Sequence, residues 1–158
     1  MYRSIVFSVI LMFSMSSISA EYEAEVLKVI DGDTIYIKSD SGRKKIRLRH
    51  IDAPELKQTF GEEAKIFLDN QLDGRKITVN SDYKDRYGRD IGDVFVYKDS
   101  EAIYINAKLV KSGHAWVYKT YRKNTYLMNL ENFAKNNKLG LWKNKSPMKP
   151  WEFRAKNK

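Results

Sequence analysis

The sequence has 158 residues, of which 42% are hydrophobic and 13% aromatic, so it suits one folded domain and excludes a disordered chain. Cysteine is absent, which excludes disulfides and cysteine-bound zinc, and two histidines are too few for a histidine-rich metal site. Any metal must therefore be held by oxygen atoms. Lys and Arg (29) outnumber Asp and Glu (20), and the net charge of +9 predicts a polyanionic partner, nucleic acid first and anionic lipid or polysaccharide second.

The first twenty residues differ in kind from the rest of the chain. Arg3 precedes an apolar run over 5–13, and the small residues that follow end at Ala20. This pattern is typical of a secretory signal peptide, so we expect cleavage after Ala20 and a secreted or periplasmic product with no stable membrane insertion. An uncleaved anchor is the alternative, but the apolar run is shorter than the roughly 20 residues that a spanning helix needs.

The chain that follows begins with segments that predict strands separated by turns. Residues that favour strands, many in alternation with polar ones, fill five segments: 26–30, 34–38, 45–50, 76–80 and 91–97. In the third segment, Ile46 and Leu48 alternate with Arg47 and Arg49, so one face is apolar and the other cationic. This order predicts a curled antiparallel meander.

Helical spacing of apolar residues appears in three later stretches: 64–72, a short segment ending at Gly113, and 125–138. Strands first, with helices interleaved and trailing, predict an α+β fold built on a small closed sheet. The five-stranded OB-type β-barrel with about three α-helices is the common form that binds oligonucleotides. We expect residues 21–142 to form this domain as a monomer, and 143–158 to be a loosely held basic tail.

Polar residues gather in three segments where a simple barrel would have turns or apolar strands. These segments are Asp31-Gly32-Asp33-Thr34, Ile51-Asp52-Ala53-Pro54-Glu55 and Asp85-Arg86-Tyr87-Gly88-Arg89-Asp90. Taken singly, the first is also the pattern of an ordinary hairpin turn, and the third is also that of a solvated loop.

Taken together, the three segments supply the parts of a site that cleaves phosphodiesters. Asp33 and Asp52 are hard oxygen ligands for Ca²⁺ or Mg²⁺, and Glu55 adds a third carboxylate. Arg47 and Arg89 carry planar guanidinium groups suited to phosphate. Hydrolysis requires a water that loses its proton, a neutralised phosphate and fixed cations for the transition state, and this set of residues can provide all three.

Four motifs, in this order, resemble the thermonuclease (staphylococcal nuclease-like) family from about Tyr22 to Trp142. The motifs are VIDGDT at 29–34, IRLRHIDAPE at 46–55, DRYGR at 85–89 and LGLW at 139–142. The resemblance implies an OB-type barrel with three helices. It also implies calcium-dependent hydrolysis of DNA and RNA that leaves 3′-phosphate ends.

The resemblance further implies roles for individual residues of this chain. The metal ligands are Asp33, Asp52 and the backbone carbonyl of Ala53, with Asp31 in the outer shell. The catalytic residues are Glu55, which matches the general base, and the two phosphate-binding arginines, Arg47 and Arg89. The nucleotide-binding residues are Arg86, Tyr87 and Tyr121.

Some positions depart from the best-known member of that family. Ala53 stands in place of a threonine, so a carbonyl ligand is retained but any contribution of the hydroxyl is lost. The loop after Glu55 is shorter, which predicts a change in the nucleic-acid conformations that are accepted. Arg86 replaces a lysine, which keeps the charge and changes its geometry.

Two other functions remain as alternatives. A secreted OB-type module that binds nucleic acid without catalysis fits the charge, but members of this kind usually lack some of the five key residues, and this chain has all of them. A basic surface adhesin gives no reason for carboxylates within a cationic surface. We also expect Trp116 to pack in the interior, His50 to be a structural strand residue, and His114 to be a local helix cap.

Overall fold

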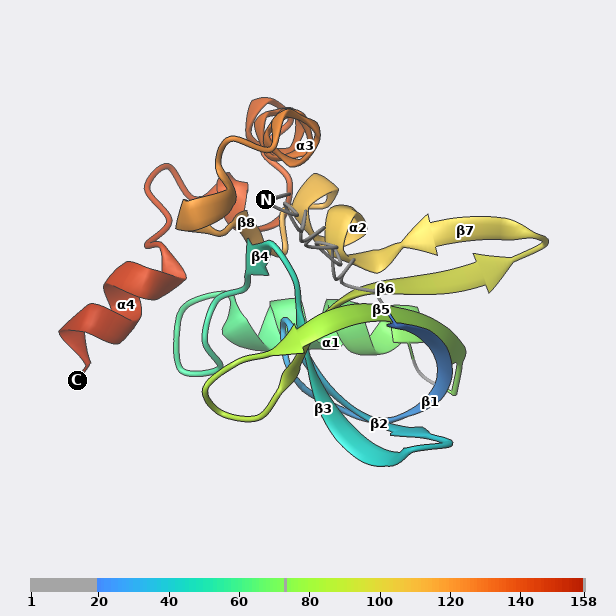
Figure 1. Cartoon of the computed structure of the whole chain (residues 1–158). Helices are drawn as coiled ribbons and strands as arrows, with labels where there is room; N and C mark the ends of the chain where they lie inside the picture. Colours follow the sequence, from blue (N-terminus) through green and yellow to red (C-terminus); the bar gives the residue numbers. More distant parts are fainter. Residues whose placement is uncertain (1–19, 73, 158) are drawn as a thin grey trace, which may run out of the picture.

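Six strands form the main sheet in the computed structural model, which describes residues 20–72 and 74–157. In spatial order they are β3 (Gly42–Leu48), β2 (Thr34–Ser39), β1 (Ala20–Asp31), β5 (Lys76–Lys84), β6 (Asp90–Lys98) and β7 (Glu101–Tyr104). Neighbours in this order pair antiparallel, and β3 also pairs in parallel with β6, which closes five strands into a barrel (Figure 1). The predicted α+β fold with an OB-type barrel is confirmed.

The alternation predicted for β3 is present in the structure. Ile46 and Leu48 are buried in the core, and Arg47 lies between them on the opposite face of the strand. Period-two patterning places every second side chain on the same face, so the core residues and the cationic side chain are specified together. This is how one strand both fills the barrel and carries a functional arginine.

The turn between β1 and β2 packs unusually close to its neighbours. A Cβ atom on Gly32 would lie 2.6 Å from the Cβ of Ala53 and 2.8 Å from the Cβ of Ala64. Only glycine allows this approach, because real Cβ contacts are not that short. The turn that carries Asp31 and Asp33 is thereby held against the segment that follows Asp52.

Three helices confirm the prediction: α1 (Gly61–Leu72), α2 (Ile105–Lys111) and α3 (Thr125–Asn136). The first packs against β1 and the third packs against the second. Gly113, just after α2, adopts φ +74°, the left-handed conformation expected of a residue past a helix end. The side chain of Asn124 caps α3 by accepting a hydrogen bond from the backbone nitrogen of Leu127 at 3.1 Å.

Two very short strands were not predicted. β4 (Ile51–Asp52) pairs antiparallel with β8 (Trp116–Val117), and Asp52 lies opposite Trp116 in the register. Two-residue strands carry no alternation that a sequence can reveal. Trp116 is 5% exposed, and its ring lies 4.2 Å from that of Trp142, centroid to centroid, so the expectation that it packs in the interior is confirmed.

The C-terminal segment contains a helix, whereas the composition predicts a loosely held basic tail. Residues 150–156 form a helix, α4 (Pro150–Lys156), which lies to one side of the barrel (Figure 1). Pro150 is buried at the first turn, where proline favours a helix start because its fixed φ suits the helix and its missing N–H costs nothing. The sequence did not reveal this helix, because a helix of seven residues is too short to show a clear period.

The predicted signal peptide lies outside the described residues except for Ala20, at which β1 begins. Among the described helices, none has the length and apolar character needed to cross a membrane.

Candidate active site

Asp33 and Asp52 come together beside the end of the barrel. Asp33 lies in the β1–β2 turn and Asp52 lies on β4, and the two residues are 6% and 1% exposed. The Oδ2 atom of Asp33 accepts a hydrogen bond from the backbone nitrogen of Ala53 at 2.6 Å. This bond links the first two of the predicted motifs directly.

Arg47 joins the two carboxylates. Its Nη2 atom lies 3.1 Å from Oδ2 of Asp33 and 2.9 Å from Oδ1 of Asp52. Its Nη1 atom donates to the carbonyl of Leu48 at 2.7 Å, which fixes the orientation of the guanidinium. Arg47 is therefore both the counter-ion of the acidic pair and a donor group held in place by β3.

The electrostatics of Asp33 are those of a buried acid among other acids. Burial raises the pKa of its carboxyl to about 8, and the charges of Asp31 and Asp52 add to the increase while Arg47 opposes it. Asp31 lies next to it, with its Oδ1 atom accepting from the backbone nitrogen of Asp33 at 3.0 Å. An additional cation at this position would stabilise the ionised form of Asp33.

Glu55 lies at the edge of this group, in a turn stabilised by Gln58. Its backbone nitrogen donates to Oε1 of Gln58 at 3.2 Å, and its carbonyl accepts from the backbone nitrogen of Gln58 at 2.8 Å. The Glu55 side chain is 38% exposed, in contrast to the buried aspartates. Solvent water can therefore reach this side chain.

The structure adds Arg154, a residue that sequence reasoning missed. Its Nη1 and Nη2 atoms lie 3.1 and 2.7 Å from Oδ1 and Oδ2 of Asp52, and Nη1 also lies 2.6 Å from Oε1 of Glu55. Partial burial lowers the pKa of Arg154, but the hydrogen bonds to both carboxylates outweigh it, so the pKa is raised. No spacing in the sequence relates residue 154 to residues 52 and 55, because α4 reaches them only through tertiary packing.

The loop over 85–89 is an ordered unit of its own. Asp85 accepts hydrogen bonds from the backbone nitrogens of Tyr87 and Arg89 and from Nε of Arg89 at 2.8 Å. The guanidinium groups of Arg86 and Arg89 lie 4.8 and 5.6 Å from the ring centroid of Tyr87, which is 68% exposed.

Arg89 is not in contact with the acidic group. Within residues 20–72 and 74–157, no hydrogen bond or ion pair joins it to Asp33, Asp52 or Glu55. The structure thus brings together Asp31, Asp33, Arg47, Asp52, Ala53 and Glu55. It leaves Arg86, Tyr87 and Arg89 on a separate loop.

Tyr121 belongs to a third cluster. It ends the 3₁₀ helix η1 (Lys119–Tyr121), and its ring lies 4.3 Å from the ring of His50, edge to face. His50 is in the turn between β3 and β4 with φ +67°, not on a strand as expected, and burial lowers its pKa. The hydroxyl oxygens of Tyr121 and Tyr83 lie 3.4 Å apart.

His114 has the local capping role that was expected. Its Nδ1 atom lies 2.9 Å from the hydroxyl oxygen of Ser112, and its backbone nitrogen donates to the carbonyl of Leu109 at 2.8 Å, just beyond the end of α2. Its ring stacks on that of Phe67 with centroids 3.9 Å apart. Burial lowers the pKa of His114 to about 4, so it is neutral in the folded protein at pH 7.

The donor set fits a hard divalent cation held by few protein ligands. In the described part of the chain, no three His, Asp or Glu side chains are grouped as a closed metal cage would be. Asp33 and Asp52 offer two buried carboxylates, with the Ala53 carbonyl in the same segment. Ca²⁺ takes six to eight oxygen ligands, so water and substrate would complete its shell and its affinity alone would be modest.

Comparison with known proteins finds one family and several close relatives. Residues 45–144 match the family described as staphylococcal nuclease homologue. The chain is 36% identical over 146 residues to an uncharacterized endonuclease of Escherichia coli O157:H7, covering 92% of this chain and 94% of that protein. It is 32% identical over 163 residues to micrococcal nuclease of Shigella flexneri, covering 99% and 93%. The family range includes Arg47, Asp52, Glu55 and Arg89.

Proposed function

Because the chain belongs to the staphylococcal nuclease family and is a nuclease, we propose that it is a calcium-dependent enzyme that hydrolyses both DNA and RNA. We further propose that cleavage leaves 3′-phosphate ends. The observation that carries the proposal is the buried pair of Asp33 and Asp52, bridged by Arg47, with Glu55 beside it at the protein surface. Hard oxygen donors, a fixed guanidinium and a solvent-exposed base are the parts that phosphodiester hydrolysis needs.

The chain's own residues divide the chemistry between them. Asp33, Asp52 and the carbonyl of Ala53 would hold Ca²⁺, which when bound supplies Lewis-acid stabilisation of the phosphate. Glu55, partly exposed, takes a proton from the attacking water. Arg47 presents its guanidinium to a phosphate oxygen on which negative charge increases in the transition state.

The loop over 85–89 is proposed as the second contact with substrate. Arg89 exchanges its bond to Asp85 for one to phosphate when nucleic acid binds. Tyr87, which is 68% exposed, offers a ring on which an unstacked base can lie. Tyr121 and Arg86 are proposed to extend this surface. A pocket of this kind favours single strands over rigid duplex.

Export is proposed from the first twenty residues. The n-region arginine, the apolar run and the small residues before Glu21 support a cleaved signal and a secreted or periplasmic enzyme. Sequencing the N-terminus of the protein recovered from the periplasm and from the medium tests this, and an intact Met1 on a membrane-bound product contradicts it.

A non-catalytic nucleic-acid-binding protein is the second candidate, and one observation favours it. Both oxygens of Asp52 and one oxygen of Glu55 are paired with arginine. Carboxylates that only stabilise the fold, without taking part in catalysis, would be paired in the same way. The intact set of carboxylates supports the enzyme more strongly.

Digestion assays separate the two candidates. Plasmid DNA and total RNA are incubated with the purified protein in Ca²⁺, in Mg²⁺ and in excess chelator, and product ends are tested for 3′-phosphate. The enzyme cuts both substrates with Ca²⁺ and neither with chelator. Retardation of both nucleic acids in a gel without cleavage under any condition supports the binding protein instead.

A further inference from the structure

The guanidinium of Arg154 forms ion pairs with Asp52 and Glu55, the two carboxylates on which the proposed chemistry depends. It pairs with both oxygens of Asp52 and with Oε1 of Glu55, at distances between 2.6 and 3.1 Å. Arg47 also donates to Oδ1 of Asp52, at 2.9 Å. Because the Asp52 side chain is 1% exposed and both its oxygens are paired, a metal ion reaches it only if one guanidinium withdraws.

The two arginines are not equally free to withdraw. Arg47 lies on β3 within the barrel, is 15% exposed, and also bonds to Asp33 and to the carbonyl of Leu48. Arg154 is 40% exposed, lies on a helix of seven residues, and its hydrogen-bond partners are Asp52 and Glu55. Solvent screens the charge of a partly exposed side chain more than that of a buried one. Arg154 is therefore the guanidinium that dissociates from Asp52 more readily.

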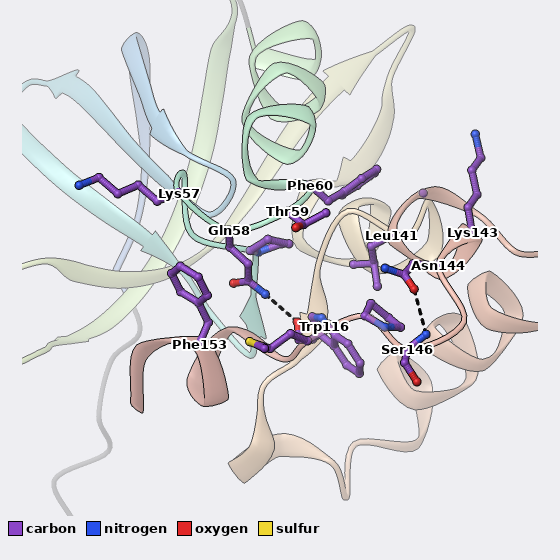
Figure 2. Close-up of a pocket in the computed structure, with 14 residues that line it drawn as sticks. Lys57, Gln58, Thr59, Phe60, Trp116, Leu141, Lys143, Asn144, Ser146 and Phe153 are labelled. Atoms are coloured by element: carbon purple, nitrogen blue, oxygen red, sulfur yellow. Dashed lines mark hydrogen bonds between the residues drawn. The ribbon is translucent and has the colours of Figure 1, made fainter. Parts of the chain in front are cut away.

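The helix that carries Arg154 is poorly packed against the rest of the molecule. A pocket of about 460 Å³ lies between the loop after β4 and the C-terminal segment, and its lining includes Gln58 and Thr59 from the loop and Ser146 and Phe153 from the C-terminal segment (Figure 2). Side chains that line a pocket make fewer contacts with the rest of the protein than fully packed ones, which lowers the free energy needed to open the segment.

Few contacts hold this segment in place. The carbonyl of Met148 accepts a hydrogen bond from Nε2 of Gln58 at 2.6 Å, and the ring of Trp151 lies 6.1 Å from that of Trp116 and 6.0 Å from that of Tyr118. Movement of α4 therefore breaks few contacts of the barrel.

We propose that α4 is a reversible ionic latch, in which Arg154 and a divalent cation compete for Asp52. Binding of the cation to Asp52 releases Arg154 from both Asp52 and Glu55, which uncovers the base as the metal arrives. The inference rests on the proposed function, since it assigns Asp52 and Glu55 the roles given there. It explains why a basic segment joins an acidic site that the barrel already supplies with Arg47.

A purely structural ion pair predicts a different result. If Arg154 only stabilises the fold, its removal lowers stability and leaves the intrinsic affinity for metal unchanged or weaker. If Arg154 is a latch, its removal tightens metal binding, because the protein no longer spends most of its time in a state that excludes the cation.

Calorimetric titration with Ca²⁺ tests the latch in the full-length mature protein. Arg154→Gln is expected to bind Ca²⁺ roughly tenfold more tightly than wild type. Arg154→Lys keeps the charge and loses the forked geometry, so a smaller tightening is expected, which separates competition from a simple change of charge. Lys156→Gln, an exposed charge on the same helix without a contact to Asp52 or Glu55, is the matched control and should bind as wild type.

Hydrogen exchange of the wild-type protein gives a second readout that needs no variant. Amide exchange over residues 151–156 of α4 should become faster when saturating Ca²⁺ is added, while exchange in β3 stays protected.

Two results overturn the inference. The first is that Arg154→Gln and Arg154→Lys bind Ca²⁺ as tightly as wild type or more weakly. The second is that amide exchange in α4 is unchanged or slower when Ca²⁺ is added. If either is found while wild type still digests nucleic acid with Ca²⁺, the latch is wrong and the proposed function stands. A wild-type protein that neither binds Ca²⁺ nor cuts nucleic acid overturns both.

Discussion

The proposed active site has two parts that differ in how firmly their residues are held. Asp33 and Asp52 are buried and Arg47 is 15% exposed, and the three hold one another through several short bonds on the barrel or on segments joined to its strands. Arg154 and the loop over 85–89 are more exposed, and they are held by α4 or by contacts within the loop itself. The difference indicates that the barrel fixes the proposed metal ligands, while the groups proposed to meet substrate are held by fewer contacts with the barrel.

The largest expected effect is a loss of catalytic rate when Glu55, which lies between the two parts, is changed. Glu55→Gln keeps the size of the side chain and removes the proton acceptor, so kcat should fall by roughly 10²–10⁴-fold. Steady-state kinetics on single-stranded DNA with saturating Ca²⁺ measures this, with the melting temperature as a control for folding. A variant that retains wild-type kcat shows that another group is the base.

Arg47→Gln should lower the stability of the buried part of the site. It leaves Asp33 and Asp52 close together with less compensating charge, and breaking a buried pair costs about 3–5 kcal/mol of the free energy of unfolding, reduced here because Arg154 still pairs with Asp52. Urea denaturation measures it. The matched control is Arg86→Gln on the exposed loop, which should change stability by less than about 0.5 kcal/mol. Equal losses for the two variants would remove the distinction between the parts.

His114 makes the stability of the protein depend on pH, independently of the acidic residues of the site. Its folded pKa is lowered to about 4 from an ordinary 6.5, so the unfolded chain binds more protons between these values. The stability contributed by neutral His114 is therefore present above pH 6.5 and is lost as the pH falls toward 4, by about 1–3 kcal/mol. Urea denaturation of wild type and His114→Gln at pH 7 and pH 4.5 measures it. The variant should lose less stability than wild type over that interval, and parallel losses contradict the assignment.

The smallest expected effect belongs to the exposed loop. Tyr87→Ala should weaken binding of a single-stranded oligonucleotide by about 1–3 kcal/mol, the usual value of one base stacked on an aromatic ring. It should leave the stability of the barrel unchanged, since Tyr87 is 68% exposed. Fluorescence anisotropy in chelator measures binding without cleavage, and Tyr97→Ala, also exposed but on β6, is the control. Equal affinities for wild type and Tyr87→Ala exclude a stacking role.

Sequence reasoning identified the residues of the buried part and of the loop over 85–89, but it missed Arg154. Alternation along β3 predicts both the core residues Ile46 and Leu48 and the cationic face with Arg47, because local geometry determines all three. The position of Arg154 depends on packing between segments about 100 residues apart, as its bonds to Asp52 show, and no periodicity records such a contact. The same limit applies to β4 and β8, which pair through tertiary proximity alone.

The position of the loop over 85–89 relative to the acidic residues also could not be predicted from the sequence. The motif at 85–89 places Arg89 with the other functional residues, but its short bonds to Asp85 form a closed local unit instead. Motifs identify which residues belong to a site, whereas their distances depend on how each loop satisfies its own polar groups.

The most direct test of the account is whether Ca²⁺ binding depends on the buried carboxylates of the barrel. Asp33→Asn keeps the shape of the side chain and an oxygen that can accept from the Ala53 nitrogen, but it removes the charge. Calorimetric titration should show Ca²⁺ affinity at least about tenfold weaker than wild type, with the melting temperature showing that the variant is folded. Equal Ca²⁺ affinity in the folded variant and wild type would contradict the central claim that the barrel carries the metal site.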